Sequence, residues 1–257
     1  MNIFDKETPI ITGSNRGIGQ SILLKFAEFG CKRIIACARK HTETFEYFIN
    51  DIANKYGIDI SPVYFDLSSQ EETKSAVKQI RQLIDFKNVV LVNCAGCLSE
   101  HLRFNMQPIE NSKRLFEVDY WGQVYFTQLL SRHMQKHRNG NIIFISSISS
   151  FEGFFSSFDY CAAKAAINVT VKQMARELGR LNIRVNAVAP GLIETDMIKS
   201  SSQESFDLIK QGIMLGRLGK KEEVANTVAF LASNLATYIT GQIVRCDGGT
   251  TPPKADW

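Results

Sequence analysis

The sequence predicts an α/β fold in which a parallel sheet carries helices on both faces. Short apolar strands alternate with amphipathic helices along most of the chain, and this alternation is typical of sheets built from parallel βαβ units. The first strand leads through a glycine-punctuated turn into a helix, which is how such a unit begins. No linker, composition break or internal repeat divides the sequence, so we expect one domain that spans residues 1–257.

The elements are predicted from short apolar runs and from apolar residues at helical spacing. The expected strands cover residues 9–12, 33–38, 60–65, 88–92, 142–145, 183–189 and 241–246. Helices are expected after the glycine turn, around residues 160–164, and at residues 43–56, 69–84, 108–137 and 220–233. The segment 108–137 is apolar on all sides, which predicts burial, with a second subunit as one covering surface. The least patterned stretch, about residues 192–215, is interpreted as a lid over the substrate.

Composition excludes several classes of protein. The net charge of +4 is too small to indicate nucleic-acid binding, although it suits anionic ligands such as phosphates. Residues 1–10 lack the apolar core of a signal peptide, and no apolar run is long enough for a membrane span. Most of the six cysteines lie in apolar segments, as expected of core residues in a reducing compartment. We therefore expect a cytoplasmic protein that works without nucleic acid or membrane.

The spacing of cysteines and histidines bears on thiol redox chemistry and on metal binding. Cys94 and Cys97 form a C-x-x-C, so a thiol redox pair is an alternative to two structural thiols. The histidines lie at no metal-ligand spacing, and we expect no metal site.

The glycine-rich turn TGSNRGIG, residues 12–19, predicts a phosphate-binding loop. Glycines let the backbone approach a pyrophosphate, and the following helix N-terminus offers N–H groups and the positive end of its dipole. The spacing G-x-x-x-G-x-G differs from the G-x-G-x-x-G fingerprint, so a turn without a ligand stays an alternative. The residues expected to hold the cofactor here are Gly13, Ser14, Asn15, Arg16, Gly17, Ile18 and Gly19.

The end of the second strand predicts which dinucleotide binds. In dinucleotide folds an acidic residue here binds the ribose 2′-hydroxyl, whereas an arginine accommodates a 2′-phosphate. Residues 31–41 contain no Asp or Glu, and Arg39 follows the strand directly. Arg39, flanked by Arg16, therefore predicts NADP(H), with a solvated basic loop as the alternative. After the third strand, Asp66 is placed to accept a hydrogen bond from the adenine amino group.

Tyr160 and Lys164 form a candidate proton donor. Residues four apart lie on one face of a helix, so the phenol and the ammonium are expected to be neighbours. The ammonium favours the phenolate, which predicts a general acid suited to neutral pH. Ser147, at the end of the preceding strand, could add a hydroxyl to the same site.

Taken together, these residues resemble the short-chain dehydrogenase/reductase family over nearly the full length of the chain. The matching pieces, in order, are TGSNRGIG (12–19), Asp66-Leu67, Asn93-Cys94-Ala95-Gly96, Ser147, Tyr160-x-x-x-Lys164 and Pro190-Gly191. Within the family the chain is most similar to 3-oxoacyl-[acyl-carrier-protein] reductases, through PGLIETDM (190–197) and residues 215–249. The resemblance implies a seven-stranded Rossmann sheet, NADPH, and a homotetramer (or homodimer) assembled through two long helices and the last strand.

The resemblance also implies residue roles. Ser147 would bind the substrate carbonyl, Tyr160 would donate the proton, and Lys164 would hold the nicotinamide ribose. Besides the glycine loop and Arg39, the implied cofactor-binding residues are Asp66, Leu67, Asn93, Ala95, Gly96, Tyr160, Lys164, Pro190, Gly191, Ile193 and Thr195. The expected reaction is reduction of 3-oxoacyl-[acyl-carrier-protein] in fatty-acid synthesis. The alternatives are another ketone or alcohol (a sugar, polyol, steroid or polyketide) and a cofactor-binding sensor without turnover.

The chain departs from the family pattern at two places. Asp119 stands where the family usually has an asparagine that supports a proton-relay water, and a carboxylate there would pair with Lys164. The acyl carrier protein, which is acidic, is expected to dock on basic residues beside the active site. Arg138 suits that role, whereas the other expected basic position is Leu181, with Arg180 next to it.

Overall fold

Seven parallel strands form one sheet, which confirms the predicted Rossmann-like α/β fold. The computed structural model describes residues 3–97, 102–151, 158–194 and 211–251. The strands lie in the order β3-β2-β1-β4-β5-β6-β7. Their bounds are β1 (Thr8–Thr12), β2 (Arg33–Ala38), β3 (Asp59–Tyr64), β4 (Val89–Asn93), β5 (Gly140–Ile145), β6 (Ile183–Pro190) and β7 (Ile243–Cys246).

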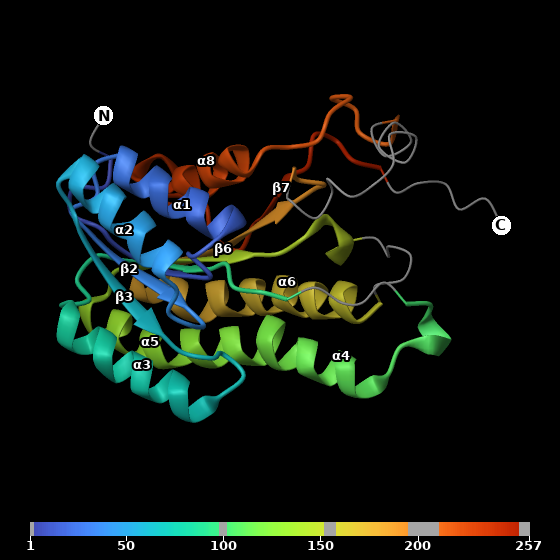
Figure 1. The fold of residues 1–257 in the computed structure, drawn as a ribbon, viewed down its shortest axis with the longest axis horizontal. Helices are drawn as coiled ribbons and strands as arrows, with labels where there is room; N and C mark the ends of the chain where they lie inside the picture. The colour runs from blue at the N-terminus through green and yellow to red at the C-terminus, as the bar shows by residue number, and fades with distance from the viewer. Residues whose placement is uncertain (1–2, 98–101, 152–157, 195–210, 252–257) are drawn as a thin grey trace.

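Helices cover both faces of the sheet (Figure 1). One apolar cluster packs α1 (Gly17–Glu28), α2 (Glu43–Tyr56) and α8 (Lys221–Ala232) on one face. A second cluster packs α3 (Gln70–Leu83), α5 (Gln123–His137) and α6 (Phe158–Leu178) on the other. None of the helices in the described ranges combines the length and the apolar composition needed to cross a membrane.

The central strands are apolar at every position because both of their faces are covered. Along β4, Val90 and Val92 face the first cluster, whereas Val89 and Leu91 face the second. Successive side chains of a strand point to opposite faces, so a strand between two helical layers needs apolar residues throughout. This explains why the sequence shows continuous apolar runs here instead of an alternating pattern.

The strand order places a topological switch point between β1 and β4. The chain adds β2 and β3 on one side of β1 and then crosses over to add β4 on the other side. Ligands of open parallel sheets bind outside the carboxyl ends of the strands at such a switch point. The loops that begin at Gly13 and Cys94 follow these two strands, so the topology brings both predicted cofactor segments to one place.

The predicted long helix at 108–137 consists of three consecutive pieces. These are α4 (Ile109–Phe116), a π-helical segment η2 (Glu117–Gly122) and α5. Within one chain the segment is not buried on all sides, because Ile109 is 61% and Trp121 55% exposed. Apolar composition predicts that a helix surface is buried, but it does not distinguish burial within the chain from burial against a second chain.

Candidate active site

The glycine loop after β1 folds back tightly on itself. Gly13 and Gly17 have φ values of +68° and +57°, a region that favours glycine. A Cβ atom on Gly13 would lie 2.8 Å from Cα of Ala95, and one on Gly19 would overlap the carbonyl oxygen of Gly13. The loop therefore needs glycine for close packing, and it presents bare backbone at the switch point.

The N-terminus of α1 is the helix end at which we expect a phosphate to bind. Its capping and first-turn residues differ from those of three other long helices in the described ranges. The flanking Arg16 makes no side-chain capping hydrogen bond, and the first turn of α1 holds no acidic residue. By contrast, α2, α3 and α8 have capping bonds and two acidic residues each in their first turns. The N–H groups of α1 thus keep their capacity for an anion, which fits the pyrophosphate of a dinucleotide.

The loop after β4 is held by Thr12, the first residue of the glycine-loop motif, and by Gln123, which no motif indicated. The Thr12 hydroxyl accepts hydrogen bonds from the N–H groups of Cys94 and Ala95, both at 3.0 Å. The Gln123 amide donates to the Ala95 carbonyl oxygen at 2.7 Å. Thr12 and Gln123 are buried, and only the polarity of Gln123 in an apolar segment could have indicated it. They fix this loop at the switch point, next to the glycine loop.

Two predicted cofactor residues use their side chains inside the protein. The Ser14 hydroxyl donates to the Cys37 carbonyl oxygen at 3.0 Å. The Asn93 amide donates to the Thr127 hydroxyl at 2.8 Å. Ser14 and Asn93 are both fully buried. Their side chains therefore shape the two loops from within.

The adenosine end of the predicted site is electropositive. Arg39 and Lys40 follow β2 and are exposed. Burial opposes ionisation of Asp66, but hydrogen bonds from Ser68, followed by the charges of Arg39 and Lys40, hold the Asp66 pKa below its usual value. Asp66 Oδ1 accepts from the N–H and the hydroxyl of Ser68 at 2.9 and 2.7 Å. The basic pair and the carboxylate thus share one corner of the sheet edge.

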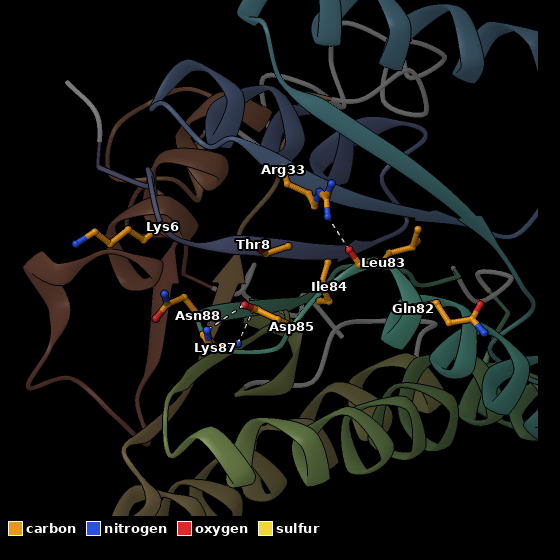
Figure 2. Close-up of a pocket in the computed structure, with 9 residues that line it drawn as sticks. All are labelled: Lys6, Thr8, Arg33, Gln82, Leu83, Ile84, Asp85, Lys87 and Asn88. Atoms are coloured by element: carbon orange, nitrogen blue, oxygen red, sulfur yellow. Dashed lines mark hydrogen bonds and ion pairs between the residues drawn. The ribbon is translucent and has the colours of Figure 1, made fainter.

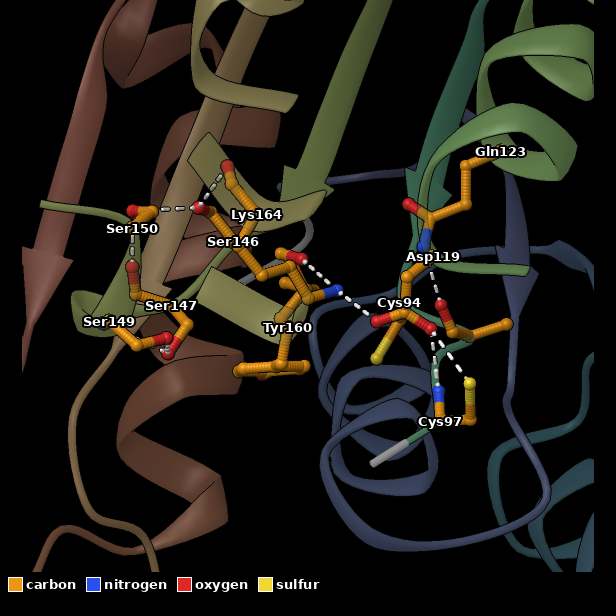
Figure 3. Close-up of polar contacts among 12 residues, drawn as sticks. Cys94, Cys97, Asp119, Gln123, Ser146, Ser147, Ser149, Ser150, Tyr160 and Lys164 are labelled. Carbon is orange, nitrogen blue, oxygen red and sulfur yellow. Dashed lines mark hydrogen bonds and ion pairs between the residues drawn. The ribbon is translucent and has the colours of Figure 1, made fainter. Parts of the chain in front are cut away.

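The catalytic candidates meet at the carboxyl end of β5 (Figure 3). Tyr160 and Lys164 project from the first turns of α6, and Lys164 Nζ lies 5.5 Å from the centre of the Tyr160 ring. Ser147 begins the turn that follows β5, and its hydroxyl accepts hydrogen bonds from the N–H and hydroxyl of Ser149 at 3.2 and 2.8 Å. The end of β5 and the start of α6 therefore bring the serine and the helical pair to one site.

Asp119 forms a buried ion pair with Lys164. Its Oδ2 lies 3.0 Å from Lys164 Nζ, and the two side chains are 0% and 5% exposed. The other oxygen, Oδ1, accepts from the N–H of Cys97 at 2.7 Å and from its thiol at 3.3 Å. Lys164 Nζ also donates to the Ile145 carbonyl oxygen at 3.3 Å. Burial by itself lowers the pKa of Lys164, but the carboxylate of Asp119 and then Tyr160 outweigh it and raise that pKa.

The thiols of the C-x-x-C segment are held in their protonated form. Burial raises the pKa of Cys94 to about 12. Burial, followed by the charge of Asp119 and its hydrogen bond, raises the pKa of Cys97 to about 12 as well. Since thiolates are the reactive form, this environment opposes the redox-pair alternative.

The loop after β6 packs against the residue that follows β7. Pro190 ends β6, and a Cβ atom on Gly191 would lie 2.7 Å from Cα of Asp247. Ile193 is buried and bridges to Gly219. Thr195 and most of the predicted lid fall outside the described residues.

The basic residues expected beside the active site lie elsewhere in the chain. Arg138 ends α5, and its guanidinium donates to the Arg180 carbonyl oxygen at 2.8 Å. Arg180 follows the C-terminal end of α6, whereas Tyr160 lies in its first turn. A helix of this length spans about 30 Å. The expectation that Arg138 lies beside the catalytic groups is therefore wrong within one chain, because both helices run away from the site.

One cavity lies away from the catalytic groups. It measures about 480 Å³ and is lined by residues at the starts of β1, β2 and β4, including Lys6, Arg33 and Lys87 (Figure 2). Arg33 is already engaged, with the Leu83 carbonyl oxygen at 2.6 Å and Asp59 at 2.7 Å. This cavity sits at the amino edge of the sheet, opposite the switch point.

Known proteins resemble the chain over nearly its whole length. A family model described as Enoyl-(Acyl carrier protein) reductase matches residues 13–251. The chain is 40% identical over 240 residues to the 3-oxoacyl-[acyl-carrier-protein] reductase FabG of Aquifex aeolicus (strain VF5), covering 93% of this chain and 95% of the relative. It is 34% identical over 241 residues to a 3alpha-hydroxysteroid dehydrogenase of Mediterraneibacter gnavus (strain ATCC 29149 / DSM 114966 / JCM 6515 / VPI C7-9), covering 93% and 94%. The crystal structure of gox2181 superposes with a TM-score of 0.89 at 28% identity, covering 96% of each chain. The chain belongs to the short-chain dehydrogenase/reductase family of oxidoreductases.

Proposed function

We propose that this oxidoreductase reduces a carbonyl group with NADPH, and that its substrate is a 3-oxoacyl group on an acyl carrier protein. The observation that carries the chemistry is the buried Lys164 ammonium beside the Tyr160 ring, next to the hydroxyl of Ser147. In the proposed reaction, Ser147 orients the substrate carbonyl by a hydrogen bond, and Tyr160 donates a proton to its oxygen. Lys164 holds positive charge beside the phenol while that proton leaves.

The residues fit a dinucleotide cofactor. Uncapped N–H groups of α1 and the bare glycine loop suit a pyrophosphate, and exposed Arg39 suits a ribose 2′-phosphate. When bound, NADPH supplies the hydride. The remaining cofactor contacts are proposed for the loops after β3, β4 and β6, with about residues 192–215 as the substrate lid of one domain spanning the chain.

The preference for an acyl substrate is supported by the relatives. The FabG relative from Aquifex aeolicus is named for 3-oxoacyl-[acyl-carrier-protein] reduction. The relative from Mediterraneibacter gnavus is named for a steroid alcohol, so a steroid or another ketone is the second candidate. Presence of free thiols at all six cysteines is consistent with a reducing, cytoplasmic setting.

A substrate panel tests the proposal. We expect NADPH oxidation with acetoacetyl-[acyl-carrier-protein] and acetoacetyl-CoA at kcat/KM values at least about tenfold above those for 3-oxosteroids and sugar ketones. If a steroid or sugar ketone has the higher kcat/KM, that ketone replaces the acyl group as the proposed substrate. Absence of turnover with every ketone, despite tight NADPH binding, would favour a cofactor-binding sensor.

Assembly into a homotetramer or homodimer is part of the proposal. Ile109, Trp121 and Val169 are 61%, 55% and 69% exposed on α4, η2 and α6, and a cavity of about 310 Å³ lies between α4 and Phe158. In a two-fold pairing of these helices, the C-terminal end of one α6 would face the N-terminal end of the other. Arg138 and Arg180 of a second copy would then approach the active site, where an acidic carrier protein could dock.

A further inference from the structure

A buried carboxylate next to the catalytic lysine alters the charge of the proton-donating centre. Lys164 alone would place one positive charge beside Tyr160, which favours the phenolate. Asp119 Oδ2, 3.0 Å from Lys164 Nζ, adds a negative charge that no solvent screens, since the two side chains are 5% exposed or less. The centre thereby becomes a neutral ion pair.

The carboxylate is fixed in this position by two donors from Cys97. The N–H and the thiol of Cys97 both donate to Oδ1. A Cβ atom on Gly96 would lie 3.2 Å from Oδ2, tighter than ordinary contacts, so the backbone of Gly96 packs closely against the carboxylate. Asp119 therefore cannot swing away from Lys164 without abandoning both donors.

The other titratable groups around Asp119 and Lys164 add no positive charge that would offset the Asp119 carboxylate. From the loop after β4, the pKa values of Cys94 and Cys97 are raised to about 12, so both thiols are neutral. From α6, buried Asp159 already accepts from the Tyr160 N–H at 2.8 Å and from Ser112 at 3.0 Å. The turn after β5 contributes the uncharged serines 146, 147, 149 and 150. Among the described residues, Asp119 is thus the carboxylate that pairs with Lys164.

We propose that Asp119 is a positioning residue that neutralises Lys164 and so keeps Tyr160 in its proton-donating form, which biases the enzyme toward reduction. This inference rests on the proposed function. Reduction needs the phenol as an acid, whereas oxidation of the alcohol needs the phenolate as a base. A carboxylate in the same centre weakens the stabilisation of the phenolate. Reduction therefore continues to higher pH, and oxidation of the alcohol begins only at higher pH. Asp119 does this through Lys164 and touches no reacting atom itself.

The size of the effect follows from the distances. Lys164 Nζ is 3.0 Å from the carboxylate oxygen and 5.5 Å from the ring centre. With an effective dielectric constant of about 20, a unit charge within about 10 Å shifts an ionisation equilibrium by on the order of one pH unit. A shift of this size is easily resolved in a pH profile.

The test compares Asp119→Asn with wild type and with Glu117→Gln, which removes an exposed carboxylate from the same π-helical segment. For the ketone of the panel that wild type reduces best, kcat/KM is measured against pH with NADPH, and the alcohol product is oxidised with NADP⁺. As the pH rises, kcat/KM for reduction should fall about one pH unit earlier in D119N than in wild type. The kcat/KM for oxidation should rise about one pH unit earlier as well. E117Q should follow wild type in both directions. A merely structural carboxylate would change rates without moving the profiles.

The outcomes separate this inference from the proposed function. Turnover with identical pH profiles in D119N and wild type would overturn the role of Asp119 and leave the reductase intact. Wild type inactive on every ketone would overturn the reductase and the inference with it. If D119N does not fold, the wild-type profile decides: the inference requires reduction to hold its plateau beyond about pH 8, near the range of an ordinary phenol. A decline that begins near neutral pH would overturn it.

Discussion

Gly19 packs its α-carbon directly against the carbonyl oxygen of Gly13, so closely that a methyl group on Gly19 would overlap that oxygen. Gly13 in turn packs against the backbone of Ala95 in the loop after β4. The start of α1, the end of β1 and the end of β4 thus meet at backbone distance. This contact lies at the switch point where we place the pyrophosphate.

Gly19→Ala is expected to damage both folding and cofactor binding. The added methyl group must displace the backbone of Gly13, and overpacking of this kind costs about 1–3 kcal/mol of unfolding free energy. Urea unfolding and NADPH titration by fluorescence measure the two effects. Gly57→Ala is the control, because Gly57 has φ +63° but open space around its Cβ position. G57A should cost about 1 kcal/mol with NADPH affinity unchanged. Equal NADPH affinity in G19A and wild type would show that the loop is not the pyrophosphate site.

Tyr160→Phe is expected to keep NADPH binding and to lower kcat by about 10²–10⁴-fold, because the ring stays but the proton donor is lost. Steady-state kinetics and NADPH titration separate the two effects. Tyr120→Phe is a matched control, since its hydroxyl contacts Thr170 at 3.2 Å and not the catalytic groups. Y160F with wild-type turnover would show that another group gives the proton.

Arg39→Ala is expected to raise the KM for NADPH by about tenfold or more, with little change for NADH. A charge-assisted contact to the 2′-phosphate is lost only with NADPH, and such contacts contribute about 1.5–3 kcal/mol. Lys32→Ala, an exposed charge just before β2, is the control and should affect neither cofactor. Equal losses for NADPH and NADH would mean that another residue reads the 2′-phosphate.

Asp119→Asn is expected to speed alkylation of Cys97 by iodoacetamide. After burial, the charge and hydrogen bond of Asp119 are the main causes that raise the Cys97 pKa, so removing the charge lowers that pKa and increases the thiolate fraction. Peptide mapping by mass spectrometry follows the rate at each thiol. Cys31 is the internal control, because burial is the first cause of its raised pKa and its charged neighbours are Glu7 and Lys32. An unchanged rate at Cys97 would mean that burial, and not Asp119, keeps this thiol unreactive.

Much of the fold could be predicted because its signals are local. Helix α2 was predicted with its exact bounds, since Thr42 caps it and Gly57 ends it in a left-handed conformation. The last strand begins at Ile243 and not at residue 241, because Gly241, with φ +72°, still belongs to the turn. Such ends depend on backbone conformations that a run of apolar letters does not reveal.

The parts of the site that depend on local spacing could be predicted, whereas contacts between distant segments could not. The spacing of Tyr160 and Lys164 on one helix face is a local property, and the structure places them as neighbours. Thr12 opens the glycine-loop motif and Gln123 carries no motif. Their contacts with the loop after β4 could not be predicted, because these hydrogen bonds join segments far apart in the chain. The expected place of Arg138 was wrong for one chain, because only the direction of α5 and α6 shows which end of the molecule it occupies.

The sequence by itself determined the alternation of strands and helices, the glycine loop, and the tyrosine and lysine one helical turn apart. Each of these follows from residues close together in the chain, where spacing and side-chain type suffice. Only the tertiary structure decided that Asp119 of η2, Cys97 after β4 and Lys164 of α6 share one buried cluster. Three separate elements meet there through the packing of helices on the sheet, and electrostatic coupling depends on that distance and on the exclusion of water.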